Sequence, residues 1–449
     1  MPKNQSSDAN DMQLEEKRTY DALIELVEEA KKHLDNLKTD PEPKRPDIPP
    51  GIPQSMLPIL RKIEQQSQVV KNLLRVPVRP SGAKSKKVEE ETKRKRDDPA
   101  EENMAVTRTM ERQKMKDKLD ELGTNLWNRT LLIHRVTKMA REVARQIHDD
   151  HSRKQTRQDA LAQWDKLFAY TRNAAYSLIQ VAGDDRRGVV RFVTRGLELA
   201  TKTALALFAA GEHEESREVL SSAAELEDIL VKKLQKGLDG LSEDQLFRQD
   251  CSKHVIEYYL ARCIFEVGRD NETLAGTLMM KALSHCNATP NDVPPRSYQH
   301  IARKCHEIGS ILLSRIDTQG QAAKDEKTGE LAVAAAQWFK NGIQLVEAKD
   351  GEGEVAKMLA PFKSPLLEGL ARASLLSLDK DPDALDRAQT ITNDLMKNPD
   401  TVDRSKMQTF LMINVQILRR KNAPSPEIMK VMERLIDLQD WDDRDAVDK

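Results

Sequence analysis

The most constraining feature of this chain is a monotonous pattern that runs from about Lys114 to Asp437. Apolar stripes of helical length follow one another, separated by short breaks rich in Gly, Asp, Asn or Pro, and no stretch shows the alternation typical of a strand. One such helix pair cannot bury its apolar face alone, so successive pairs stack on one another. The pattern predicts an all-α fold, a tetratricopeptide-like α-solenoid of antiparallel helix pairs with a repeat period in the mid-thirties to forties.

Small residues indicate where two of these helices approach most closely. We expect three alanines before the turn at Gly211 to face two alanines after it: Ala200, Ala204, Ala206, Ala223 and Ala224. We also expect Trp127, Trp164 and Trp338 to be mostly buried between helices. A helical bundle of two domains is the alternative architecture, and it is equally all-α.

Composition narrows the possible functions. Charged residues make up 32% of the chain and aromatic residues only 4%, which favours long exposed helices. The 72 Lys and Arg residues nearly balance the 73 Asp and Glu residues, so no field of the whole molecule attracts nucleic acid or an anionic membrane. The N-terminus lacks a signal peptide and no window approaches a membrane span. We therefore expect a soluble intracellular protein that binds neither membranes nor nucleic acid directly.

The composition shifts three times along the chain, which predicts four regions. Residues 1–75 carry N-terminal helical segments joined by a Pro-rich linker, and residues 76–113 are a charged linker with too few apolar residues to fold. Residues 114–437 are the helical-repeat solenoid, and residues 438–449 are an acidic tail.

Two basic clusters lie in the charged linker. They consist of Lys84, Lys86 and Lys87, and of Lys93, Arg94, Lys95 and Arg96. Compact runs of cations in unfolded chain are typical of nuclear import signals. The alternative is a solvated linker whose own acidic residues, at 89–91 and 97–98, neutralise these cations.

The search for catalytic chemistry finds no nucleotide-binding, hydrolase, zinc-protease or calcium motif. The four cysteines have no CxxC spacing, and we interpret them as reduced thiols packed in helices. A zinc site with ligands from the pairs His285-Cys286 and Cys305-His306 is a minor alternative. We predict no enzyme activity, no metal and no cofactor; an enzyme of an unfamiliar all-α type is a remote alternative.

A series of short blocks resembles one protein family. The segment Gly123-Thr124-Asn125-Leu126-Trp127-Asn128 is similar to the Gly-Thr-x-Leu-Trp-Asn signature of the meiosis-specific tetratricopeptide crossover and synapsis scaffold, the sporulation protein of the Zip-four type in its fungal form. Further blocks follow in the same order over residues 115–436: 191–230, 259–262, 274–275, 301–313, 336–339 with 342–343, 370–373, 383–385, 418–424 and 432–436.

This resemblance implies a nuclear, chromosome-associated scaffold that joins crossover factors to the synaptonemal complex through a helical-repeat surface. It implies a structural role for the signature residues and for Trp338 and Phe339. Two departures put the partner set in doubt, namely the longer loop at 321–329 and the acidic tail where family members continue. The alternative function is a cytosolic tetratricopeptide adaptor, such as a co-chaperone or transport subunit. Neither the partners nor the oligomeric state follows from the sequence.

Overall fold

A computed structural model describes most of the chain. The described residues are 5–37, 49, 51–75, 99–144, 151–183, 189–235, 244–318, 326–351, 353–378, 380–396 and 404–438. Within them the regular structure is α-helical, with one short 3₁₀ helix and no strand, which confirms the all-α prediction. The chain divides into two compact units, residues 1–242 (unit 1) and 243–449 (unit 2). This boundary falls inside the region predicted as one solenoid, and the two units are described separately below.

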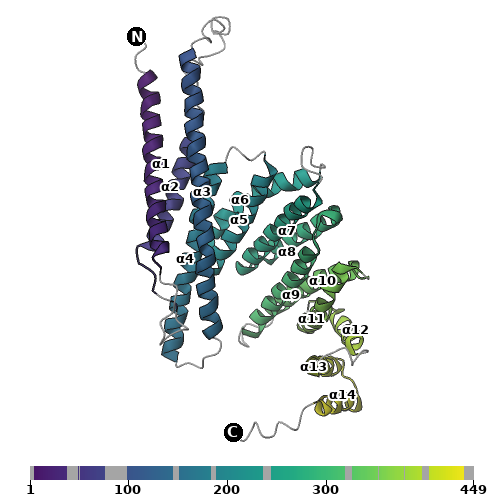
Figure 1. The fold of residues 1–449 in the computed structure, drawn as a ribbon. Helices are drawn as coiled ribbons and strands as arrows, with labels where there is room; N and C mark the ends of the chain where they lie inside the picture. The colour runs from purple at the N-terminus through teal and green to yellow at the C-terminus, as the bar shows by residue number, and fades with distance from the viewer. Residues whose placement is uncertain are drawn as a thin grey trace. The chain divides into compact units, whose positions relative to one another are not determined.

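Unit 1 contains the first six helices, which run from purple to teal in Figure 1. They are α1 (Gln5–Asp35), α2 (Met56–Arg75), α3 (Pro99–Ala144), α4 (His151–Gly183), α5 (Val190–Ala209) and α6 (His213–Gln235). Helix α4 contacts α2, α3 and α5, while α1 packs on α2 and α3. Unit 1 is therefore organised around α4.

The core of unit 1 corrects two predicted boundaries. Buried residues of α1 and α2, such as Leu23 and Ile63, share one hydrophobic cluster with Leu119 of α3 and Trp164 of α4. The region 1–75 is thus not separate from the fold that follows. Helix α3 already begins at Pro99, so the prediction of an unfolded linker is wrong for residues 99–113, where a helix continuous with the packed part of α3 overrides a polar composition.

Polar contacts fix α1 and α2 in this unit. The Arg112 guanidinium donates from Nε and Nη2 to the two carboxylate oxygens of Glu16, at 2.9 and 2.8 Å, and Glu16 is buried. Such a bidentate arginine–carboxylate pair is among the stronger hydrogen-bonded contacts in proteins. On α2, Arg61 donates to the hydroxyl of buried Tyr170, and its guanidinium lies 4.5 Å from the centre of that ring.

The turn between α5 and α6 is set by one glycine. Gly211 has φ +82°, a left-handed conformation that glycine adopts without steric cost, and the Glu212 N–H returns to the Leu207 carbonyl at 2.9 Å. Across this turn the Ser216 hydroxyl donates to the Ala204 carbonyl at 2.9 Å. Of the predicted alanine contacts, Ala200, Ala204, Ala206 and Ala223 are buried, whereas Ala224 is half-buried.

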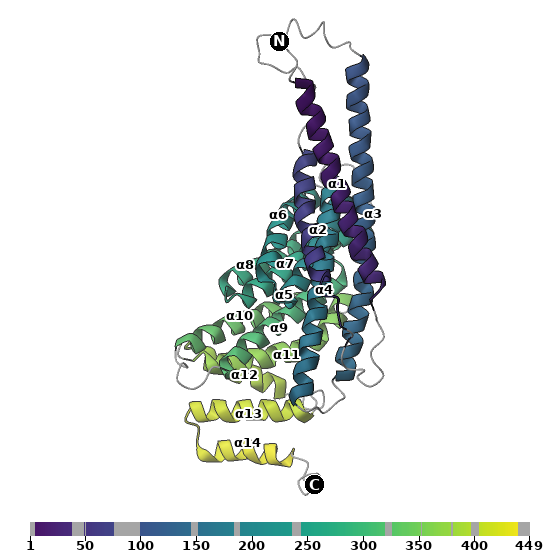
Figure 2. The ribbon, with the colours of Figure 1, turned by 90° about the vertical axis from the view of Figure 1, so that its left-hand side faces the viewer.

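Unit 2 contains the remaining helices, coloured from teal to yellow (Figures 1 and 2). They are α7 (Gln245–Gly268), α8 (Glu272–Ala288), η3 (Pro290–Asp292), α9 (Pro295–Thr318), α10 (Glu326–Ala348), α11 (Glu354–Leu376), α12 (Ala384–Met396), α13 (Arg404–Arg420) and α14 (Ser425–Asp437).

The helices of unit 2 stack as pairs. Each odd-numbered helix contacts the even-numbered helix that follows it, and α9, α11 and α13 also each contact the preceding odd-numbered helix. Contacts restricted to neighbours along the chain are the mark of a solenoid. The odd-numbered helices begin at Gln245, Pro295, Glu354 and Arg404, spacings of 50 to 59 residues. The predicted period was too short because most of these helices are longer than those of a standard tetratricopeptide repeat.

Candidate interaction site

Three helices of unit 2 meet around one phenylalanine. An ideal Cβ on Gly309 of α9 would lie 2.6 Å from the Phe339 ring of α10, and one on Gly369 of α11 would lie 2.3 Å from it. Both distances are shorter than real contacts allow, and Phe339 is fully buried. Only glycine lets α9 and α11 approach the ring from both sides, so this contact fixes the spacing of the two helices.

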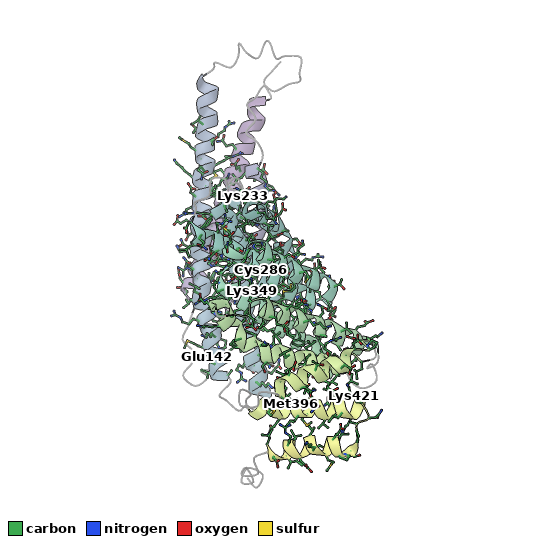
Figure 3. The ribbon with its side chains drawn as sticks, turned by 90° about the vertical axis from the view of Figure 1, so that its right-hand side faces the viewer. Glu142, Lys233, Cys286, Lys349, Met396 and Lys421 are labelled. Carbon is green, nitrogen blue, oxygen red and sulfur yellow. The ribbon has the colours of Figure 1, made fainter. Side chains whose placement is uncertain are left out.

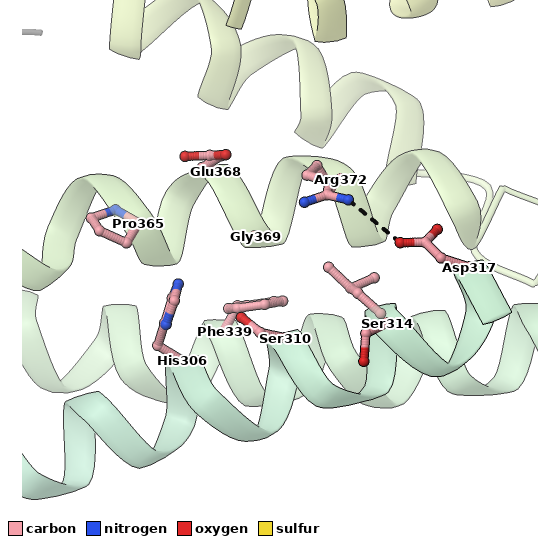
Figure 4. A pocket seen from close by; sticks show the side chains of 10 residues that line it. His306, Ser310, Ser314, Asp317, Phe339, Pro365, Glu368, Gly369 and Arg372 are labelled. Atoms are coloured by element: carbon pink, nitrogen blue, oxygen red, sulfur yellow. Dashed lines mark ion pairs between the residues drawn. The ribbon is translucent and has the colours of Figure 1, made fainter. Parts of the chain in front are cut away.

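A pocket of about 150 Å³ lies between α9 and α11 above this ring (Figure 4). Its walls come from α9 and α11, and Phe339 is the only residue of α10 that lines it. The lining residues are His306, Ser310, Leu313, Ser314, Asp317, Phe339, Pro365, Glu368, Gly369 and Arg372. The His306 ring contacts Phe339 edge-on, with the ring centres 6.1 Å apart.

One ion pair joins the two walls. An Arg372 nitrogen lies 3.9 Å from an Asp317 oxygen, and both side chains are about half exposed or more. Such a long exposed pair contributes little to stability, so a ligand that offers its own charges can replace it. The pocket thus combines an aromatic floor, two hydroxyls and charges of both signs, a set that suits a side chain of a bound peptide.

The pocket lacks the geometry of a nucleophilic site. The Ser314 hydroxyl donates to the Ile311 carbonyl at 2.9 Å, and among the described hydrogen bonds none joins Ser310 or Ser314 to His306. A catalytic serine needs a base within hydrogen-bond reach. Stacked helix pairs of this kind typically bind other proteins and rarely catalyse reactions.

The signature residues lie together on α3 in unit 1 but have different environments. Gly123 allows close contact with α4, since a Cβ there would lie 2.7 Å from Ile179. The Thr124 hydroxyl accepts a hydrogen bond from Arg195 at 2.6 Å. Leu126 is buried, Trp127 is half-buried and Asn128 is exposed. Gly123 and Leu126 are therefore buried inside the unit, Thr124 and Trp127 are half-buried, and Asn128 is exposed.

The remaining predicted residues divide into two groups. Trp338 and Phe339 are both buried, as is Trp164, which confirms their predicted packing positions. The import candidates Lys84, Lys86, Lys87, Lys93, Arg94, Lys95 and Arg96 lie outside the described residues, as does the acidic tail from residue 439 onward.

The four cysteines and His285 are buried in the core of unit 2, whereas His306 lines the pocket. Burial raises the pKa of Cys286 to about 12 although Lys349 lies near it (Figure 3), so its thiol stays protonated. His285 Nε2 forms a hydrogen bond with the Ser252 hydroxyl at 2.8 Å. Among the described residues no group of three or more His, Cys, Asp or Glu side chains is placed to hold a metal ion. The described helices include none that is long and apolar enough to span a membrane.

Sequence reasoning missed the pocket itself. Its residues come from three helices, α9, α10 and α11, and none of them forms a motif in the sequence. The glycines at 309, 342 and 369 were the available signal, because each lies inside a helix where glycine is normally unfavourable.

No protein-family model matches this chain, and no curated protein matches it in sequence. A solved structure described as a circular tandem repeat protein with novel repeat topology and enhanced subunit contact surfaces aligns over 95% of this chain and 98% of that chain. The two are 12% identical, with a TM-score of 0.27. The fold described above rests on the packing of the helices and not on this likeness.

Proposed function

We propose that this protein is a nuclear scaffold that binds other proteins during meiotic crossover formation and chromosome synapsis, and that it acts by binding alone. The observation that carries this proposal is the α9–α11 pocket, built into a stack of helix pairs with Phe339 as its floor. Half of its lining falls in the blocks that resemble the meiotic scaffold family, since residues such as Ser310, Phe339 and Arg372 belong to the segments 301–313, 336–339 and 370–373.

The pocket explains how binding works without turnover. A helical or extended partner segment lies along α9 and α11, and one of its side chains enters between them to contact the Phe339 ring. Charged groups of the partner displace the long contact between Arg372 and Asp317. Because two glycines hold the ring in place, the site is largely formed before the partner arrives, which limits the entropy lost on binding.

The test uses a substitution that fills the pocket. Ser310 is half-buried in the α9 wall, and Ser310→Trp should occupy the space that a partner side chain needs. The matched control is Ser284→Trp on α8, because Ser284 is exposed and does not line the pocket. Affinity capture of the tagged full chain from meiotic cells should recover crossover or synaptonemal complex proteins with the parent and the control, and not with Ser310→Trp.

One result would contradict the meiotic role, and another would exclude the pocket as the binding site. Recovery of chaperones or transport subunits from the cytosol in place of chromosomal proteins would favour the adaptor function. Equal recovery of chromosomal partners by Ser310→Trp and Ser284→Trp would leave the scaffold role standing and exclude this pocket as its binding site.

A further inference from the structure

An arginine in unit 1 lies on two aromatic rings. The Arg172 guanidinium of α4 is 4.1 Å from the ring centre of Phe168 and 4.9 Å from that of Trp127 on α3. Its Nη1 donates to the Lys202 carbonyl of α5 at 3.1 Å. Contacts with three helices therefore fix the position of this cation.

Arg172 has no acidic partner among the described residues. No carboxylate forms an ion pair with it, and its buried Nε has no hydrogen-bond partner. Burial lowers the pKa of Arg172 to about 10, which still leaves the guanidinium charged at neutral pH. A partly desolvated cation gains more from a new carboxylate than a fully hydrated one does.

Apolar surface adjoins this cation. Trp127, Leu131 and His134 recur at helical spacing on one side of α3, and the His134 ring lies 5.6 Å from that of Phe168. Leu131 is 64% exposed and Trp127 is half-buried. Tryptophan and arginine at the centre of an apolar patch are the residue types that dominate the energy of protein interfaces.

We propose that the surface formed by Trp127, Leu131, Phe168 and Arg172 binds a segment of a partner protein that carries an Asp or Glu beside a leucine-like side chain. The carboxylate pairs with the Arg172 guanidinium, and the apolar side chain packs on Leu131 and Trp127. This inference rests on the proposed function, protein binding, and assigns it a second surface in a different unit. Its occupant follows from charge complementarity, because no carboxylate of the described residues pairs with the Arg172 cation.

The surrounding charges favour a protein over a nucleic acid. Two neighbouring cations of α5 are already paired: Arg195 with Asp120 at 3.2 Å, and Lys202 with Glu198. Because Arg195 and Lys202 already have carboxylate partners among the described residues, they add little positive charge for a phosphate backbone to bind. A phosphate backbone needs a row of cations.

The test begins with a displayed library of random twelve-residue peptides, selected on the full chain. Selected peptides should be enriched in Asp or Glu next to Leu, and replacing that acid with its amide should weaken binding about tenfold or more. Leu131→Glu places a negative charge at an exposed position of the surface. This charge repels the acidic residue of the peptide, so the substitution should abolish binding. Met139→Glu is the matched control, because Met139 is 52% exposed on the same helix and lies outside the patch.

Arginine variants locate the carboxylate contact. Arg172→Lys keeps the charge and loses the planar fork, so it should retain weakened binding, whereas Arg172→Met should lose it. Arg262→Met serves as a control, since Arg262 also lies near a tyrosine ring but pairs with Glu266. If the selected peptides lack an acidic residue, or bind Leu131→Glu and Met139→Glu equally, this surface is not the binding site. The proposed function, protein binding, would not be contradicted by that result. Binding of a single-stranded oligonucleotide that requires Arg172 would also overturn the inference.

Discussion

The contact between Phe339 and its two glycines gives the sharpest test of how unit 2 is packed. The substitution is Gly369→Ala in α11. Its new Cβ would lie 2.3 to 2.7 Å from three atoms of the Phe339 ring, closer than any real contact. The ring has little room to move, because Gly309 of α9 also lies close to it. Either the ring leaves its preferred rotamer or α9 and α11 separate.

The expected cost combines two opposite effects. Overpacking of this kind costs about 1–3 kcal/mol. Replacing a glycine inside a helix stabilises by about 0.5–1 kcal/mol, which offsets part of that cost. We therefore expect a net loss of about 1–2 kcal/mol, or a decrease in Tm of roughly 2–8 °C for a unit of this size.

A matched glycine supplies the control. Gly276 lies inside α8, and an ideal Cβ there meets nothing within 4 Å. Gly276→Ala should therefore raise Tm, so the two substitutions should differ in sign. Thermal unfolding followed by circular dichroism measures both, and amide hydrogen exchange should show faster exchange in α9–α11 for Gly369→Ala alone.

A second-site substitution tests the cause. Phe339→Leu shortens the ring side chain, so adding it to Gly369→Ala should cost less than the sum of the two single changes by about 1 kcal/mol or more. If Gly369→Ala and Gly276→Ala have the same effect on Tm, or if the double variant is simply additive, the described contact does not limit the approach of α9 and α11.

Three further predictions follow from individual residues. Trp338→Ala should cost about 3–5 kcal/mol, because the ring is buried, and should abolish partner capture by unfolding nearby helices; an unchanged Tm with lost capture would make Trp338 a contact residue. Burial lowers the pKa of His285 in the folded state, so the unfolded chain takes up a proton first as the pH falls below 6.5. The free energy of unfolding should therefore decrease in that pH range. His285→Gln should reduce this pH dependence, as measured by urea unfolding at several pH values. Replacing Lys93, Arg94, Lys95 and Arg96 with alanine should move a fluorescent fusion out of the nucleus; a fusion that stays nuclear would show that this cluster is not needed for import.

The sequence predicted the helices well because their signals are local. The breaks at Gly211 and at residues 268–270 coincide with the ends of α5 and α7, where Gly211 and Asp270 adopt positive φ. Buried tryptophans at 164 and 338 also follow from apolar stripes at helical spacing. Each of these features depends on residues within one or two helical turns.

The unit boundaries could not be predicted because they depend on contacts between distant segments. The N-terminal part of α3 is as polar as unfolded chain, yet Arg112 there pairs with Glu16 of α1. Composition measures how much apolar surface a segment carries, and says nothing about a partner helix that lies some hundred residues away. The packing of α1 and α2 against α3 and α4 depends on contacts between distant segments, so it is visible only in the structure.

The Arg172 surface shows the same limit at the level of one residue. In the sequence, Arg172 is one of 72 Lys and Arg residues, most of which are expected to be solvated, and nothing near it suggests a site. Its distinction comes from Trp127 and Phe168, which stack with it, and from the absence of a carboxylate partner among the described residues. The signature segment pointed to Trp127, but only as a packing residue. The Trp127 ring is half-buried and stacks with the Arg172 guanidinium, a combination that suits the binding role proposed above for this residue.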